Sequence, residues 1–348
     1  MFHGGKEGPN FMRKTVYGHL GSSTSRVLVG PGKGLDNGVV RLGHGQVMIV
    51  TVDPVSAIPA FGMKISAWLS VHLIASDYTA SGLDPQFAIF SYNLPPPMSA
   101  SERDVYVSAI GNECRRLGVT IVAGHTGSYP GSGYTVIGAG AMIGLAKEGG
   151  YVTPSMAREG DVVLMTKDAA IEASGSLAAS FPNFVRKRLG AAVASKAKNK
   201  LKLCTTVNDA RTARRIGLGD GVTSMHDATE GGVLGGLDEM ASASAKAFEV
   251  DLSRIPVSTE SELVCGAFGL DPLNTMSEGA LLMTCRPEKV SNLEKVMSKA
   301  QIQVSVIGSV KGGSGLRLKE GDGRRRTFKP AADRYWLAYD RALEQGLN

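Results

Sequence analysis

The sequence predicts a globular protein of α/β or α+β class, built as two domains or as one large domain. Three observations support this prediction. The 348 residues exceed the size of most single domains. Hydrophobic residues make up 43% of the chain and charged residues 20%, so a full core can form. The 44 glycines are spread between apolar runs, as ligand-binding proteins with closely approaching loops often require.

Apolar runs and their boundaries predict the elements of the first half, after a polar segment, 1–25, that is expected to be flexible. A largely apolar helix should run from about residue 65 to near Asp77. A second helix should begin at the capping box of Ser99 and Glu102 and end at Gly118. Pro54 is expected to end the third strand. The predicted strands are 26–29, 39–42, 47–52, 87–92, 119–123 and 136–145.

A domain boundary is expected within 151–161, after which the pattern starts again with a strand. A basic helix over 185–202 could touch nucleic acid, but a solvated face is favoured, so nucleic acid is not an expected partner. Arg324–Arg326 is predicted to form a solvated hairpin tip. The other expected elements are strands at 162–166, 248–251, 280–284 and 304–308, and helices at 233–245 and 336–343.

Composition narrows the class of protein. No run of about 18 apolar residues occurs and no apolar core follows the first methionine, so a soluble cytoplasmic protein is expected. Lys and Arg exceed Asp and Glu by 38 to 32, a net charge of +6. This charge suits an anionic ligand such as a nucleotide, and equally suits a basic surface without a role. The four cysteines form no CxxC pair and are expected to be buried thiols.

Three acidic residues of the first half form the candidate site. Asp77 lies near the end of the apolar helix, where an unpartnered carboxylate is costly, so it should meet a cation or lie at a cleft edge. A helix-end carboxylate without a role is the alternative. Asp53 ends a predicted strand, and Asp36 lies in the glycine-rich loop 30–38. Carboxylates from separate elements can hold Mg²⁺, which in turn binds phosphates.

Glycine-rich loops supply further candidates. The loop 30–38, with Lys33, can bring N–H groups close to phosphate, although it lacks the GK[ST] ending of a P-loop and a mobile surface loop is the favoured alternative. His125 and His226 are both predicted on glycine-rich loops, where each is either an acid–base or phosphate-donating group or a histidine without a role. The sequence has no zinc-type ligand spacing and no nucleophile elbow.

Four segments, in this order, resemble the superfamily that contains aminoimidazole ribonucleotide (AIR) synthetase, selenophosphate synthetase, thiamine-monophosphate kinase and the hydrogenase-maturation protein HypE. They are residues 50–53, 75–85, 118–126 and 225–232, with a less specific match at 269–279. The hydrogenase-maturation branch is the most similar. The resemblance implies an α+β chain of two domains, with N-terminal domains pairing into a dimeric β-barrel and a C-terminal α+β sandwich. The implied parts are a flexible segment 1–26, an ATP-binding domain 27–153 and a second domain 154–348.

The resemblance also implies ATP and Mg²⁺ in the cleft between the domains of a homodimer. It implies phosphoryl transfer that activates an oxygen of a small molecule or of a partner's side chain. Asp77 and His125 are then the candidate catalytic residues, and Asp36, Asp53 and Asp77 the metal ligands. The implied nucleotide-binding residues are Lys33, Asp36, Asp53, Gly124, Thr126, Asp227, Thr229, Gly231 and Gly232.

Departures from the family pattern support an alternative. His125 stands where the family has an aspartate, and a neutral imidazole binds Mg²⁺ poorly. The chain would then be a catalytically inactive nucleotide-binding homodimer with a regulatory or assembly role. Asn37 follows Asp36 where the family has a pair of acids. No cysteine follows Cys285, so the cysteine dehydration of the hydrogenase-maturation protein is not expected.

Overall fold

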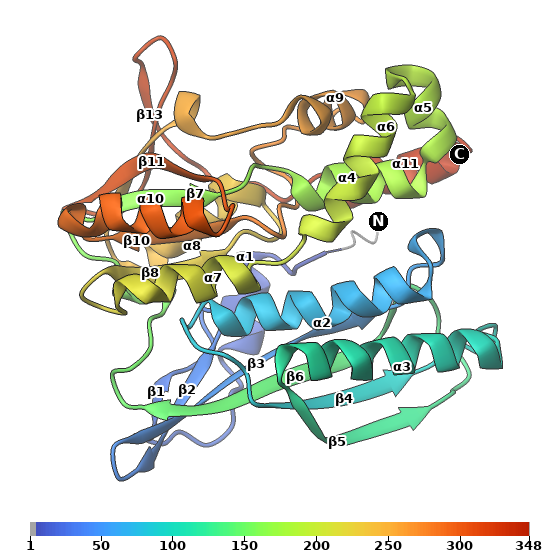
Figure 1. Ribbon diagram of the computed structural model, residues 1–348, viewed down its shortest axis with the longest axis horizontal. Coiled ribbons are helices and arrows are strands. Elements are labelled where there is room, and N and C mark those ends of the chain that lie inside the picture. The colour runs from blue at the N-terminus through green and yellow to red at the C-terminus, as the bar shows by residue number, and fades with distance from the viewer. Residues whose placement is uncertain (1–4, 348) are drawn as a thin grey trace.

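Two β-sheets, one from each half of the chain, lie on either side of the long helix α2 in this computed structural model, which describes residues 5–347 (Figure 1). The first half forms the strands β1 (Val27–Val29), β2 (Gly38–Gly43), β3 (Gln46–Ser56), β4 (Phe87–Asn93), β5 (Thr120–Gly127) and β6 (Val136–Lys147). Its helices are α1 (Pro9–Phe11), α2 (Met63–Thr79) and α3 (Ala100–Leu117). The predicted capping box of α3 is confirmed at Ser99 and Glu102.

The second half contributes a larger sheet and most of the helices. Its strands are β7 (Val162–Thr166), β8 (Val222–Asp227), β9 (Ala247–Asp251), β10 (Leu281–Cys285), β11 (Val304–Lys311), β12 (Gly315–Lys319) and β13 (Arg325–Thr327). Its α-helices are α4 (Ile171–Ser180), α5 (Pro182–Leu189), α6 (Ala191–Asn199), α7 (Val207–Ala213), α8 (Gly232–Ser244), α9 (Thr259–Ala267), α10 (Val290–Lys299) and α11 (Tyr335–Glu344). Short 3₁₀ or π turns are η1 (Met12–Val16), η2 (Pro59–Phe61), η3 (Pro154–Met156), η4 (Lys200–Leu203), η5 (Arg214–Ile216), η6 (Leu252–Arg254) and η7 (Pro287–Lys289).

The first sheet has the order β1-β2-β3-β6-β4-β5, and helices α2 and α3 cover one of its faces (Figure 1). Glycines on β6 let α2 approach closely. A Cβ at Gly140 would lie 2.6 Å from Ile74 Cδ1, and one at Gly144 would lie 2.2 Å from Tyr78 Oη. The opposite face of the sheet carries exposed apolar side chains, and in Figure 1 no helix lies over it.

Helix α2 is buried on most sides because it belongs to two cores. Val71 and Ile74 pack with the first sheet, whereas Leu69 packs with residues of the second domain such as Leu237 on α8. A helix that is apolar around its circumference requires such an environment. The prediction of a buried helix that ends near Asp77 is therefore confirmed.

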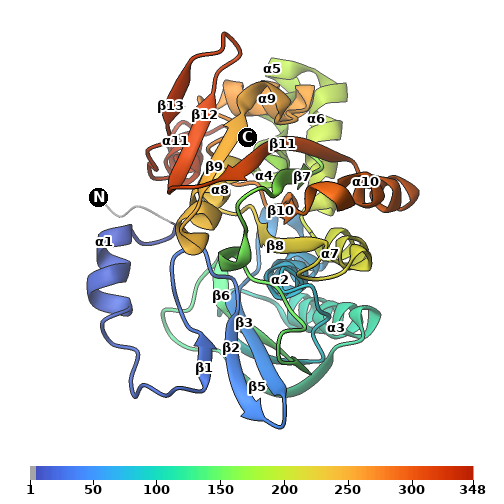
Figure 2. The same ribbon diagram turned by 90° about the vertical axis from the view of Figure 1, so that its left-hand side faces the viewer.

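The second sheet has the order β13-β12-β9-β11-β7-β10-β8. Helix α8 packs on one face through a core that includes Val163, whereas Leu164, the next residue of β7, faces the core formed by α7 and α10. Figure 2 shows the β12–β13 hairpin standing out at the end of the second domain far from the first sheet. Across residues 5–347, no helix is both long and apolar enough to span a membrane.

Four predicted elements are wrong in detail. β3 continues through Pro54, which lies opposite Ala139 of β6. Strand β2 pairs with β3 only as far as Val50, so beyond this residue one edge of β3 has no neighbouring strand within the described part of the chain. A proline whose missing N–H would face that open edge costs no ladder hydrogen bond. The expected loop 124–127 is part of strand β5, and 224–227 is part of β8. The basic helix is divided at Gly190, whose φ of 89° does not fit a helix interior.

Candidate active site between the domains

Four aspartates from both domains come together beside the last turn of α2. Asp36, Asp53 and Asp77 come from the first domain, and Asp227 comes from the end of β8; these four are called the acidic cluster below. Thr51 Oγ1 donates to the Asp36 carbonyl at 2.8 Å, and Asn37 Nδ2 donates to the Asp77 carbonyl at 2.8 Å. These bonds hold the loop 30–38 against β3 and α2.

Burial and mutual repulsion dominate the electrostatics of the acidic cluster. Burial raises the pKa of Asp77 well above its usual value, and the carboxylates of Asp227 and Asp53 add to the shift. Burial likewise raises the pKa of Asp53 to about 6 and that of Asp227 to about 7. The charged form of such a group of carboxylates requires nearby cations.

Several oxygens of the acidic cluster are buried without a hydrogen-bond partner. Both carboxylate oxygens of Asp227 and Oδ2 of Asp36 are in this state among the described residues. Asp36, His226 and Asp227 also form a group whose potential ligand atoms lie within 4.8 Å of one another. Carboxylate oxygens are the ligands that Mg²⁺ prefers, so the oxygens of Asp36 and Asp227 fit a hard divalent cation, whereas the imidazole of His226 does not.

His226 holds the two domains together at this site. Its Nδ1 lies 2.7 Å from Asp36 Oδ1, and its Nε2 lies 3.0 Å from Glu239 Oε2. Burial alone would lower the pKa of His226, but these two carboxylates outweigh burial and raise it well above its usual value. The side chain is therefore an imidazolium held by two acids on a buried strand, rather than a free acid–base group on a loop.

A second acidic wall adjoins the cluster, formed by Glu172 at the start of α4 and Glu278 before β10. Each has a buried carboxylate oxygen without a hydrogen-bond partner among the described residues. Burial raises the pKa of Glu278 well above its usual value, and Asp227 adds to the shift. Glu278 lies within the segment 269–279 that resembles the family, but neither it nor Glu172 was among the predicted site residues. The only sequence signal of Glu172 is a lone charge in an Ala- and Ser-rich helix.

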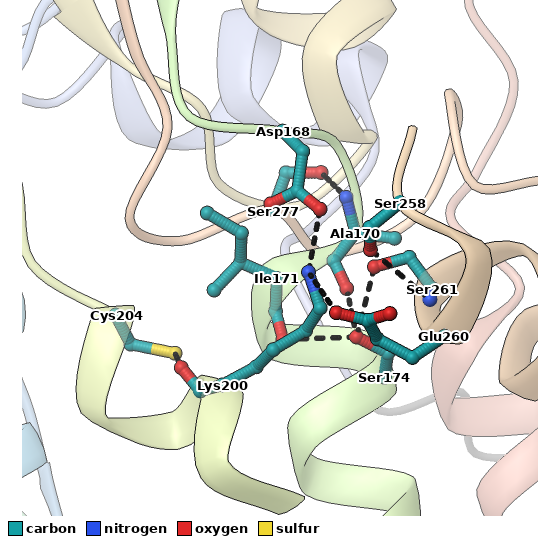
Figure 3. A network of polar contacts seen from close by, with 10 residues as sticks. All are labelled: Asp168, Ala170, Ile171, Ser174, Lys200, Cys204, Ser258, Glu260, Ser261 and Ser277. Atoms are coloured by element: carbon teal, nitrogen blue, oxygen red, sulfur yellow. Dashed lines mark hydrogen bonds and ion pairs between the residues drawn. The ribbon is translucent and has the colours of Figure 1, made fainter. Parts of the chain in front are cut away.

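A buried polar network fixes the start of α4 (Figure 3). Lys200 Nζ lies 2.5 Å from Asp168 Oδ2 and 4.0 Å from Glu260 Oε1. This lysine is buried, so the prediction of a solvated helix face is wrong for Lys200. The Ala170 N–H donates to Ser277 Oγ at 2.8 Å, which joins the residues before α4 to the residue preceding Glu278. The network thereby positions Glu172 and Glu278 together.

Glu172 should make stability depend on pH. Burial raises the pKa of its carboxyl from 4.5 to about 8, with Glu230 adding to the shift. Because the folded state holds this proton more tightly than the unfolded state, its contribution to stability is complete below about pH 4.5 and is lost as pH rises through 8. Glu172→Gln cannot ionise, so its Tm should rise relative to the unsubstituted protein between pH 6 and pH 9. Differential scanning fluorimetry measures this difference, with Glu294→Gln on α10 as the exposed control; a difference that stays constant with pH would contradict it.

Lys6, which was not among the predicted site residues, brings a cation to this site. Its Nζ donates to Thr229 Oγ1 at 2.7 Å, and its main-chain N–H donates to Glu230 Oε2 at 2.5 Å. Burial of the ammonium would lower the pKa of Lys6, but Glu239 and Asp77 outweigh it and raise the pKa. Nothing in the local sequence pattern marked this residue, because its partners lie more than two hundred positions away.

Other predicted ligand-binding residues already have protein partners. Lys33 Nζ lies 2.6 Å from Asp238 on α8, so the loop 30–38 packs against the second domain. The Gly231 N–H donates to Asp333 Oδ2 at 2.9 Å, and the Gly232 N–H donates to the Thr229 carbonyl at 3.1 Å. The N–H groups at the start of α8 are therefore already bonded within the chain, and the anion beside them is the carboxylate of Asp333.

His125, Gly124 and Thr126 lie away from these groups, on the exposed edge strand β5. His125 Nε2 lies 2.6 Å from Tyr129 Oη. A Cβ at Gly124 would lie 2.7 Å from the Phe90 carbonyl, which gives this glycine a packing role. The hydrogen bonds and ion pairs of residues 5–347 include none that joins His125 to the acidic cluster.

Comparison with protein-family models finds both halves of one family. Residues 34–146 match the N-terminal domain of AIR synthase related protein, and residues 158–320 match its C-terminal domain. Carbamoyl dehydratase HypE of Rhizobium leguminosarum bv. viciae is 29% identical over 274 residues, which cover 74% of this chain and 73% of the relative. Selenide, water dikinase of Methanococcus maripaludis is 24% identical, over 79% of this chain and 83% of the relative.

Solved structures show the same fold. A chain of a HypE–HypF complex superposes with a TM-score of 0.72 at 18% identity, covering 92% of this chain and 99% of that chain. A HypE structure in complex with ATP gives a TM-score of 0.68 at 20% identity, covering 93% and 92%. At these identities the likeness establishes the α+β architecture of two domains.

Proposed function

Since this chain belongs to the AIR synthase related family, we propose that it is an ATP- and Mg²⁺-dependent phosphoryl-transfer enzyme. Its substrate would be an oxygen atom of a small molecule or of a partner's side chain, activated as its phosphate. The observation that carries the proposal is the acidic cluster, with buried carboxylate oxygens of Asp36 and Asp227 that have no hydrogen-bond partner among the described residues. The relatives named as a dikinase and as an ATP-bound maturation protein support the same reaction class.

Asp36, Asp53, Asp77 and Asp227 are the residues that would hold the cation. When bound, Mg²⁺ neutralises phosphate charge and orients the phosphates for transfer. The remaining groups of the site then act through charge and position. Lys6 offers an ammonium to a phosphate oxygen, and His226 keeps Asp36 in place through its 2.7 Å contact. Glu172 and Glu278 lie beside the acidic cluster, where their carboxylate oxygens that lack a partner within residues 5–347 could accept hydrogen bonds from N–H or O–H groups of a substrate.

We also propose that the protein acts as a homodimer through the uncovered face of its first sheet. Val52, Val136 and Leu145 are exposed apolar side chains on this sheet. Contiguous exposed apolar surface of this kind is typical of an interface. Pairing would also place β5, with His125, Gly124 and Thr126, against a second copy of the chain.

The alternative is a nucleotide-binding dimer that lacks catalysis and serves regulation or assembly. It is favoured by His125, which stands at a family aspartate position and contacts Tyr129 on an exposed strand. Such a protein would bind Mg·ATP without turning it over.

Isothermal titration of ATP into the purified protein, with and without Mg²⁺, tests the proposal, followed by a phosphate-release assay on the same sample. Mg²⁺-dependent binding with slow phosphate release is the expected result. Binding without release, across a panel of small hydroxyl- and carboxyl-containing acceptors, would favour the regulatory alternative. Absence of binding in both titrations would overturn the proposal and the alternative together.

A further inference from the structure

A groove of about 570 Å³ lies on the second domain, on the face of the β9–β12–β13 sheet opposite α8. Strand alternation places Phe248 and Leu316 toward α8, whereas Glu249 and Arg317 face the groove. Five cationic side chains line it: Arg254, Arg317, Lys319, Arg325 and Arg326. This site is separate from the acidic cluster and has no part in the proposed phosphoryl transfer.

The positive charge of the groove exceeds its negative charge. Its two carboxylates are already paired, Glu249 with Arg317 at 3.3 Å and Asp251 with Lys319 at 2.9 Å. Arg326 pairs with Glu320, outside the groove, at 2.6 Å. Among residues 5–347 no ion pair is formed by Arg254 or Arg325, so these two guanidinium groups are available to an anion.

Like charges also face each other across the hairpin. Lys319 of β12 and Arg325 of β13 are direct cross-strand partners on the groove side. Such a pair destabilises a sheet unless an anion lies nearby. Asp251 already pairs with Lys319. A carboxylate supplied by a ligand would therefore be most stabilising beside Arg325.

The outer edge of β13 is free to pair. The Phe328 N–H donates to the Leu316 carbonyl and the Glu320 N–H donates to the Arg324 carbonyl, both at 2.8 Å. By the alternation of an antiparallel ladder, Arg325 and Thr327 direct their N–H and C=O groups away from β12. β13 is exposed along its whole length, so this edge is a template for an incoming strand.

We propose that an extended acidic segment of a partner protein pairs with the outer edge of β13 and places its carboxylates over Arg325 and Arg254. Main-chain bonds to the edge would give affinity, and the unpaired guanidinium groups would select acidic side chains. A nucleic acid fits the groove less well. Among residues 5–347, no aromatic side chain lines the groove for base stacking.

The test is fluorescence anisotropy of the full chain with a labelled octapeptide of alternating Glu and Val. Arg325→Gln should weaken binding about tenfold, the loss of one charge-assisted contact. Arg324→Gln, at the exposed tip beside Asp322 and outside the groove, is the matched control and should bind normally. Thr327→Pro removes only an outward N–H and should also weaken binding, with thermal melts confirming that each variant is folded.

Two further probes decide the chemistry. A peptide of the same charge with proline at alternate positions cannot pair as a strand, and it should bind about tenfold more weakly. A single-stranded oligonucleotide of equal charge should bind more weakly than the Glu–Val peptide. Equal binding of the proline peptide, tighter binding of the oligonucleotide, or no effect of Arg325→Gln would each overturn the proposal.

Discussion

Asp77→Asn should reduce Mg²⁺-dependent phosphate release by on the order of 10²- to 10³-fold, while the protein stays folded. The amide keeps the shape of the side chain but removes the charge that a cation would require. Burial and the Asp227 and Asp53 carboxylates already raise the pKa of Asp77, so its replacement relieves repulsion. In the absence of Mg²⁺ the Tm of the variant should therefore equal or exceed that of the unsubstituted protein.

The matched control is Asp84→Asn, a change of the same kind outside the acidic cluster. Asp84 accepts from Arg211 at 2.5 Å and pairs with Arg214 at 2.8 Å, so it links the first domain to α7 and its continuation. Because these groups are partly exposed, the loss should be about 0–1 kcal/mol of stability without a change in ATP binding. If Asp77→Asn lowers Tm and ATP binding in parallel, Asp77 is a structural residue.

Val52→Arg should convert the proposed homodimer into a monomer. Val52 is 66% exposed in the single chain, and the alternation of β3 points it away from the face that buries Ile49 and Thr51. A charged side chain at the centre of an apolar interface is strongly disfavoured, because burial would leave it without a partner. Size-exclusion chromatography with light scattering should give half the mass of the unsubstituted protein. At concentrations low enough for the unsubstituted dimer to dissociate, the two proteins should have nearly the same Tm.

Leu343→Arg is the control for Val52→Arg. Leu343 is an exposed leucine of α11 in the second domain, away from the uncovered sheet face. Its replacement should leave the mass unchanged. A monomeric unsubstituted protein, or equal effects of the two substitutions, would contradict the proposed interface.

The sequence predicted best where one local pattern decides the structure. The apolar run before Asp77 required a buried helix, and the Ser99–Glu102 pair required a helix start; both are present. Predictions weakened where glycine suggested a loop. Gly124 lies within strand β5, where a side chain is excluded because a Cβ would lie 2.7 Å from the Phe90 carbonyl. A packing requirement of that kind cannot be recognised from neighbouring residues.

The site was predictable only as a set of isolated acids. Asp53 and Asp77 were predicted at the ends of a strand and a helix, and Asp36 in a loop, but their common position depends on how β3, α2 and the loop 30–38 pack. His226 was predicted on a loop, and its role as an imidazolium between two carboxylates follows from contacts with the first domain. Lys6 and Glu172 could not be assigned, because their neighbours at the site come from segments far away in the sequence.

Helix α2 makes the two domains one cooperative unit. Because Leu69 and Ile74 lie on the same helix but in different cores, a fragment that ends at the domain boundary would expose the Leu69 side to water. Neither half is therefore expected to fold by itself, and heating should give a single calorimetric transition. A hinge between the domains would require α2 to leave one core, so Asp77 is expected to stay fixed relative to both sheets.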